Sequence, residues 1–148
     1  MATRREEILA ALKTSLEGIT VANGYELTLN KVERGLRHYD NVPGPEMPAL
    51  FIAGADEVRK NISVSNFESR MSVALVGYVE NNDREALQQD VNKLVGDITR
   101  KIYSDPRLGG LAVWSDVVAV QTDDGFFTPK AVCEITVEIQ YVRPGNEP

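Results

Sequence analysis

The sequence predicts an α+β fold: a mixed β-sheet of about five strands, two amphipathic helices packed on one face of that sheet, and a C-terminal β-hairpin. Two segments, 4–17 and 83–103, carry apolar residues at the spacing of an amphipathic helix. Segment 128–142 alternates apolar and polar residues, which is typical of a strand with one buried face. Turn residues at 123–125 join it to a second strand pattern at 112–122, and the two strands form the predicted hairpin.

The first helix has clear end signals. Thr3 and Glu6 have the spacing of a capping box, in which each side chain satisfies a backbone amide of the first turn. The glycine at Gly18 suits the position just past the last turn. Four apolar residues form one stripe between these ends: Ile8, Leu9, Leu12 and Leu16. The alternation that follows predicts a strand over residues 25–34.

The middle of the chain is less regular. Pro43, Gly44, Pro45 and Pro48 predict a loop over 35–48, and the apolar run after it predicts a short strand over 49–53. We expect the polar segment 54–68 to be a mobile loop. Segment 70–79 is apolar on both faces of a strand, so we expect this strand to be central in the sheet and covered on both sides.

The second helix is the strongest pattern in the chain. Asn82 and Glu85 can cap it, and one continuous apolar stripe runs along it: Leu87, Val91, Leu94, Val95, Ile98 and Ile102. The stripe is too broad for a coiled-coil seam, so this helix should pack on the sheet. A connector at 105–111 with two glycines permits a tight reversal, and residues 143–148 are expected to fray.

Composition bounds the function. The 148 residues suit a single domain spanning 1–148, with a 43% hydrophobic share that argues against disorder. The longest nearly apolar run, 48–55, is far shorter than the ~20 residues of a membrane span, and residues 1–7 do not resemble a secretory signal. A single cysteine, Cys133, cannot form an internal disulfide, so we expect a protein made and used in a cytosol. The net charge of −6 disfavours a reader of nucleic-acid sequence.

The residues suggest no catalytic, cofactor or metal site. His38 is the only histidine, which excludes a two-histidine metal site and leaves an exposed loop residue as the simpler interpretation. Cys133 lies on the inward phase of a strand, where a buried inert thiol is expected. Asp123 and Asp124 have too few ligands for a calcium site and are better explained by a turn. We therefore do not expect an enzyme.

Other residues suggest assembly. Phe126 and Phe127 follow the hairpin turn and could either fold back onto the core or dock on a neighbouring subunit, where aromatic residues are favoured. Trp114 is open to the same two interpretations. Glu134 and Glu138, on the polar phase of the last strand, could face solvent or, in a ring, the channel.

The order of elements carries a resemblance to a known family. The helix over 83–103, the connector Asp105-Pro106-Arg107-Leu108-Gly109-Gly110-Leu111 and the strand ending in residues 135–141 resemble the tail terminator proteins of long-tailed bacteriophages, the minor tail protein U-like group. The resemblance covers nearly the whole chain. It implies a structural virion protein, made in the host cytoplasm, that forms a ring, by analogy a hexamer, at the head-proximal end of the tail tube. Such a ring ends tube polymerisation and joins tail to head.

The partners that the resemblance implies are further copies of the chain, the tail tube protein, the head–tail connector or neck protein, and genomic DNA passing without sequence preference through the channel. No membrane partner is implied. A neck or head-completion protein, or a tail tube subunit, is the alternative within the same virion, because fold alone does not separate these roles. A small enzyme or ligand-binding domain is a further alternative, for which His38 is the sole candidate group.

Overall fold

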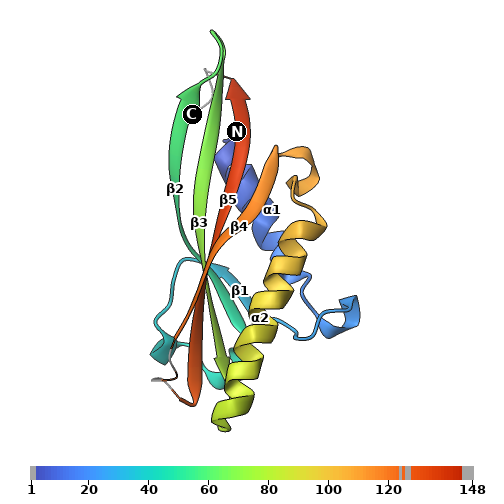
Figure 1. Cartoon of the computed structure of the whole chain (residues 1–148), viewed down its shortest axis with the longest axis vertical. Helices are drawn as coiled ribbons and strands as arrows, with labels where there is room; N and C mark the ends of the chain where they lie inside the picture. Colours follow the sequence, from blue (N-terminus) through green and yellow to red (C-terminus); the bar gives the residue numbers. More distant parts are fainter. Residues whose placement is uncertain (1–2, 124, 126–127, 145–148) are drawn as a thin grey trace.

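The computed structural model describes residues 3–123, 125 and 128–144, and it confirms the predicted α+β fold. Five strands form one mixed sheet in the order β1-β2-β3-β5-β4, in which only β1 and β2 are parallel (Figure 1). Four single-turn 3-10 helices lie in the connections of the described part. The main elements are α1 (Arg4–Glu17), β1 (Lys31–Arg34), β2 (Ala49–Asn61), β3 (Asn66–Glu80), α2 (Arg84–Ser104), β4 (Trp114–Thr122) and β5 (Lys130–Pro144).

Both helices bury their apolar stripes in one cluster on a single face of the sheet. The predicted stripes of α1 and α2 join inward-facing residues of β2, β3 and β5 in this cluster. Gly77 of β3 lies directly under α2, and a side chain at this position would meet Leu94 at 2.7 Å and Cys133 at 3.0 Å. The absence of a side chain at Gly77 therefore allows α2 to approach the sheet closely. No helix of the described part is long and apolar enough to cross a membrane.

A smaller apolar cluster covers part of the opposite face. The segment predicted to be a loop, 35–48, contains two single-turn 3-10 helices, Tyr39–Asn41 and Gly44–Glu46, and folds over the half of β2 and β3 that contains Phe51 and Tyr78. The Tyr78 hydroxyl donates a hydrogen bond to the carbonyl of Arg37 at 2.7 Å, and the ring of Tyr78 lies 5.6 Å from that of Phe51. The prediction of a central strand at 70–79, apolar on both faces, is thereby confirmed, because β3 is third of five strands and packs against both clusters.

The strand predicted over 25–34 is wrong for its first half. Only Lys31–Arg34 pair with the sheet, as β1. The amides of Glu26 and Leu27 instead donate to the two carboxylate oxygens of Asp97, at 3.1 and 2.8 Å. Asp97 is a buried residue of α2, so a side chain distant in sequence takes the backbone hydrogen bonds that a neighbouring strand would otherwise have made.

The mobile loop predicted over 54–68 is also wrong. Strands β2 and β3 continue through this segment and form a long antiparallel hairpin, paired up to Asn61 and Phe67. The turn at its tip is held by hydrogen bonds from the Ser63 amide to Asn61 and from the Asn66 amide to the Ser63 hydroxyl, both 3.1 Å. The outer residues of the hairpin are polar because one face of it is uncovered, so their polarity misled a prediction based on hydrophobicity.

The C-terminal hairpin of β4 and β5 is confirmed, but the predicted fraying is wrong at residues 143 and 144. Both residues extend β5 and pair with β3, and Arg143 is buried with its guanidinium 5.1 Å above the ring of Phe67. Residues 145–148 lie outside the described residues. The two glycines of the connector have positive φ angles, 69° at Gly109 and 95° at Gly110, as the predicted reversal requires.

Candidate assembly interface

The sheet has one face that neither α1 nor α2 covers, here called the open face; loop 35–48 covers only the part of it around Phe51 and Tyr78. Pairing register places on it the side chains that alternate with the core residues of β2, β3, β4 and β5. Acidic groups predominate along this surface. Its carboxylates are Asp56, Glu68, Glu80, Asp116, Glu134 and Glu138, and its cations are Lys60, Arg70 and Lys130. The open face is therefore a negatively charged surface across four strands.

The two glutamates expected on a polar strand face both lie on the open face. Glu134 is exposed, and Glu138 is partly exposed with its carboxylate 3.6 Å from Arg70 Nη1. Arg70 also pairs with Glu68, at 3.4 Å. These ion pairs partly neutralise the charge around Arg70. Of the two predicted glutamates, Glu134 therefore keeps more of its negative charge uncompensated.

Of the three aromatic residues predicted to lie at an interface, the structure describes Trp114. Trp114 begins β4 opposite Gln140 and is 50% exposed, so its ring belongs to the open face and not to the core. An exposed tryptophan is available for contact with a second surface, and aromatic residues are enriched in protein interfaces. Phe126 and Phe127 lie outside the described residues.

The outer edge of β4 is a second exposed feature. Its nine residues include a single charged side chain, Asp116, and two exposed valines, Val118 and Val120. One side chain protects this edge: the Tyr103 hydroxyl donates to the Asp116 carboxylate and accepts the outward amide of Val117 at 3.1 Å. Proteins usually protect such an edge with lysine, proline or a covering segment, because a free edge can pair with another strand.

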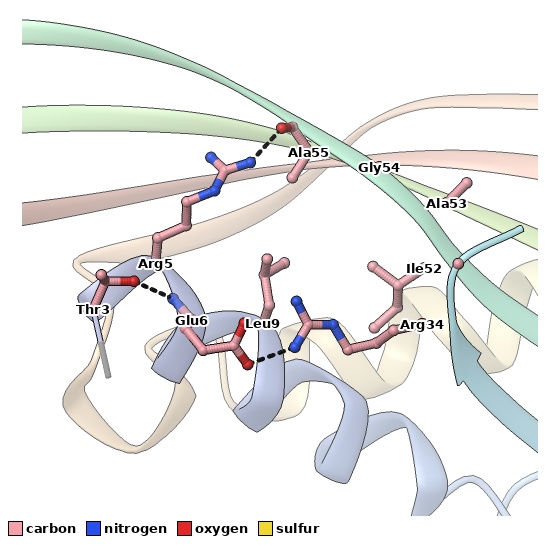
Figure 2. A pocket seen from close by; sticks show the side chains of 10 residues that line it. Thr3, Arg5, Glu6, Leu9, Arg34, Ile52, Ala53, Gly54 and Ala55 are labelled. Atoms are coloured by element: carbon pink, nitrogen blue, oxygen red, sulfur yellow. Dashed lines mark hydrogen bonds and ion pairs between the residues drawn. The ribbon is translucent and has the colours of Figure 1, made fainter. Parts of the chain in front are cut away.

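The opposite side of the sheet has a comparable free edge. Strand β1 pairs with β2 only as far as Ile52, so β2 continues unpaired on that side from Ala53 to Asn61. Where β1 ends there is a notch of about 470 Å³ between α1 and β2 (Figure 2). Its lining includes Leu9, Ile52 and Ala55, and Arg5 crosses it to donate to the Ala55 carbonyl at 2.6 Å.

Beneath Arg5 lies an ion-pair network that hydrophobic patterning did not reveal. The Glu57 carboxylate accepts from the Tyr141 hydroxyl at 2.6 Å and from Arg5 at 3.1 Å, and it also pairs with Arg59. Burial would raise the pKa of Glu57, but these hydrogen bonds outweigh burial and hold its pKa below the usual value. The network joins α1, β2 and β5. The sequence signal for this network is Glu57, a charged residue on the inward-facing side of β2.

Two of the groups considered for catalysis, His38 and Asp123, line one pocket of about 390 Å³ together with Glu134. His38 is exposed, and its Nδ1 accepts the amide of Asp40 at 3.2 Å as the cap of a single helical turn. Burial raises the pKa of the Cys133 thiol to about 12, which removes the thiolate that a nucleophile needs. Within the described ranges, no three histidine, cysteine or acidic side chains are grouped to hold a metal ion. Asp124 of the predicted turn lies outside those ranges.

The arrangement therefore offers surfaces for association: an acidic open face, an exposed tryptophan, and a free strand edge on each side of the sheet. A scan of protein-family models and a search of curated proteins each found no match, so these two comparisons assign no family to the chain.

Proposed function

We propose that this chain is a structural virion protein that forms a ring at the head-proximal end of a bacteriophage tail tube, ends polymerisation of the tube and provides the surface that joins tail to head. The observation that carries the proposal is the acidic open face. Helices α1 and α2 cover one side of the sheet, whereas the other side, partly covered by loop 35–48, carries six carboxylates and three cations across four strands.

A ring that places the open face toward its centre would have a negatively charged channel. Such a wall repels the phosphates of DNA and lets the duplex slide without binding, because DNA affinity depends on cations that neutralise phosphates. The covered face then lies outward. Glu134 is exposed near the middle of this wall and Glu138 lies beside Arg70, so Glu134 contributes most to the repulsion.

The proposed ring also accounts for the remaining partners. A ring of identical subunits has two different ends, so one end can match the last ring of tail tube protein while the other receives the head–tail connector. In this proposal the ring closes through heterologous contacts between copies, with about six copies by analogy to the tail terminators. The protein is made in the host cytoplasm and becomes part of the virion.

The first test is particle mass across protein concentration, by light scattering coupled to size exclusion, with electron microscopy of the largest species. Closed rings that never grow into tubes are the expected result. Open-ended tubes would identify a tail tube subunit instead. If the protein stays monomeric at every concentration, purified tail tubes are added: binding at one tube end supports a terminator, and no binding contradicts the proposal.

A further inference from the structure

The two free edges of the sheet expose compatible hydrogen-bonding groups. The Ala55 carbonyl accepts from Arg5 and the Val117 amide donates to Tyr103, so both groups point out of the sheet. Because backbone groups alternate along a strand, the other outward residues can be assigned from these two, allowing for the bulge between Val117 and Ala119. They are Glu57, Arg59 and Asn61 on β2, and Ser115, Val120 and Thr122 on β4.

Strand direction also suits pairing between copies. Strands β2 and β3, β3 and β5, and β5 and β4 are each antiparallel, so β2 and β4 run in opposite directions within one subunit. Rotation about an axis roughly along the strands preserves direction. It therefore brings β4 of one copy beside β2 of the next as an antiparallel pair. Antiparallel pairing is slightly more stable per residue than parallel pairing.

Three requirements select the register of this pair: the outward backbone groups must oppose one another, like charges must not lie opposite one another, and β4 must not overlap β1. The first requirement permits only shifts by an even number of residues. The level register places Asp116 opposite Asp56 of the next copy and drives the lower end of β4 into the place of β1. A shift by two residues removes the like charges, but it gains no opposite pair and still brings β4 against the end of β1.

A shift by four residues satisfies all three requirements. It places Asp116 opposite Lys60 of the next copy, and Lys60 forms no ion pair with any residue of its own chain that the structure describes. Trp114, 50% exposed, then lies opposite Ile62, 49% exposed. Ala119 lies opposite Val58, which is 72% exposed. In this register β4 stops before it reaches β1.

We propose that β4 of one copy pairs antiparallel with the free edge of β2 in a second copy of this chain, with Trp114 opposite Ile62, Asp116 opposite Lys60 and Ala119 opposite Val58. This inference rests on the proposed ring and names the contact that closes it. Tyr103 and Arg5 cover the two edges in the isolated subunit and give up their backbone hydrogen bonds when the strands pair.

The register agrees with the geometry of a closed sheet. In one subunit Val58 lies level with Trp114 through Arg70 and Gln140, so pairing Trp114 with Ile62 adds an offset of four residues across four strands. One residue of offset per strand is the stagger of an eight-stranded barrel of shear 8, whose strands tilt by about 36°. A repeating contact of this kind therefore closes without distorting the strands.

The test is disulfide cross-linking of a double variant, Val58→Cys with Ala119→Cys. Directly opposed residues approach closely enough for a disulfide, whereas residues two positions apart do not. The matched control is Asp56→Cys with Ala119→Cys, which forms a disulfide only in the register shifted by two. Strands β3 and β5 separate the new cysteines within one chain, and Cys133 is 1% exposed, so cross-links report contacts between copies.

Under mild oxidation the first variant is expected to give a ladder of covalent multimers in a denaturing gel without reductant, and the control only monomer. Cross-links in the control alone would overturn the register. Rings seen by light scattering with no cross-link in either variant would overturn the edge contact while the ring function stands. A monomer in both assays at every concentration, also with tail tubes added, would overturn both.

A charge exchange gives an independent readout. Lys60→Glu and Asp116→Lys are each expected to weaken association by roughly two- to fivefold, since each places like charges opposite one another. Combining them restores an opposite pair, so the double variant should assemble better than either single variant. Additive loss in the double variant would contradict the pairing of these two residues.

Discussion

The two faces of β5 differ in what they determine. Ile135, Val137 and Ile139 are fully buried beneath the helices. Glu134 and Glu138 alternate with them along the same strand and remain in contact with solvent on the open face. The buried set defines how the sheet and helices pack, and the other set can therefore change chemically at little cost to the fold. In this protein the second set is acidic, which is what makes it a candidate for function.

Neighbouring residues of β5 should show the largest contrast in stability. Ile135→Ala is expected to lower the free energy of unfolding by about 2–5 kcal/mol, because it leaves a cavity under the helices. Thr136→Ala, on the open face, is expected to change it by no more than about 0.5 kcal/mol. Urea unfolding followed by circular dichroism measures both. Equal losses would mean that the two faces are not as different as described.

Removing the buried carboxylate of the covered face should have the next largest effect. Glu57→Gln is expected to cost about 1–3 kcal/mol at neutral pH, because charge-assisted hydrogen bonds from Arg5 and Tyr141 are weakened. The folded state lowers the pKa of Glu57 from 4.5, so its stabilisation is present above the unfolded value and is lost as pH falls through the folded value. The difference between variant and parent should accordingly shrink below about pH 4.5. A difference constant from pH 7 to 3 would contradict this.

Two glycines compare a covered with an uncovered site. Gly77→Ala is expected to lower stability by about 1–3 kcal/mol, since the added carbon meets Leu94 at 2.7 Å and Cys133 at 3.0 Å. Gly96 lies on the exposed side of α2 with nothing within 4 Å of an added carbon. Gly96→Ala should therefore raise stability, by about 0.5–1 kcal/mol. Thermal denaturation would order the three proteins, and a stabilised Gly77 variant would show that α2 packs less closely than described.

Substitutions on the open face are expected to have the smallest effect on stability, and they should instead affect function. Glu134→Gln with Glu138→Gln should change the free energy of unfolding by less than about 1 kcal/mol, because both side chains contact solvent. If the open face lines the channel of the proposed ring, neutralising it should slow DNA passage in virions. Packaging and ejection rates measure this, with Glu7→Gln and Glu85→Gln on the helices as a control of equal charge change. Unchanged rates in the channel variant would contradict the assignment of the open face.

Local patterns predicted the parts of the fold that depend on neighbours in sequence. The apolar stripe of α2 and the alternation of β5 each lie within one segment, so their spacing was sufficient. The outer half of the β2–β3 hairpin could not be predicted in this way. It is a strand because β3 pairs with β5 along its full length, and those partners lie about seventy residues apart. Hydrophobic spacing contains no information about such pairing.

The candidate surface shows the same limit. Glu134, Glu138 and Trp114 were identified individually, since alternation assigned each to an outward phase. Their common face with Asp56 and Asp116 depends on the order of the strands. The free edge of β2 depends on β1 ending at Arg34, because in the parallel register only residues after Arg34 could cover β2 from Ala53 onward. The chain leaves the sheet there at Gly35, whose φ is 94°.

The position of β5 has a consequence for synthesis. It is the last of the described strands to leave the ribosome, yet it lies between β3 and β4 in the sheet. Until it arrives, β3 has one unpaired side and the helices have only part of their platform. Pairing between segments so distant in sequence closes slowly, and an incomplete sheet exposes apolar surface that aggregates. The nascent chain therefore keeps apolar surface exposed until β5 has been translated.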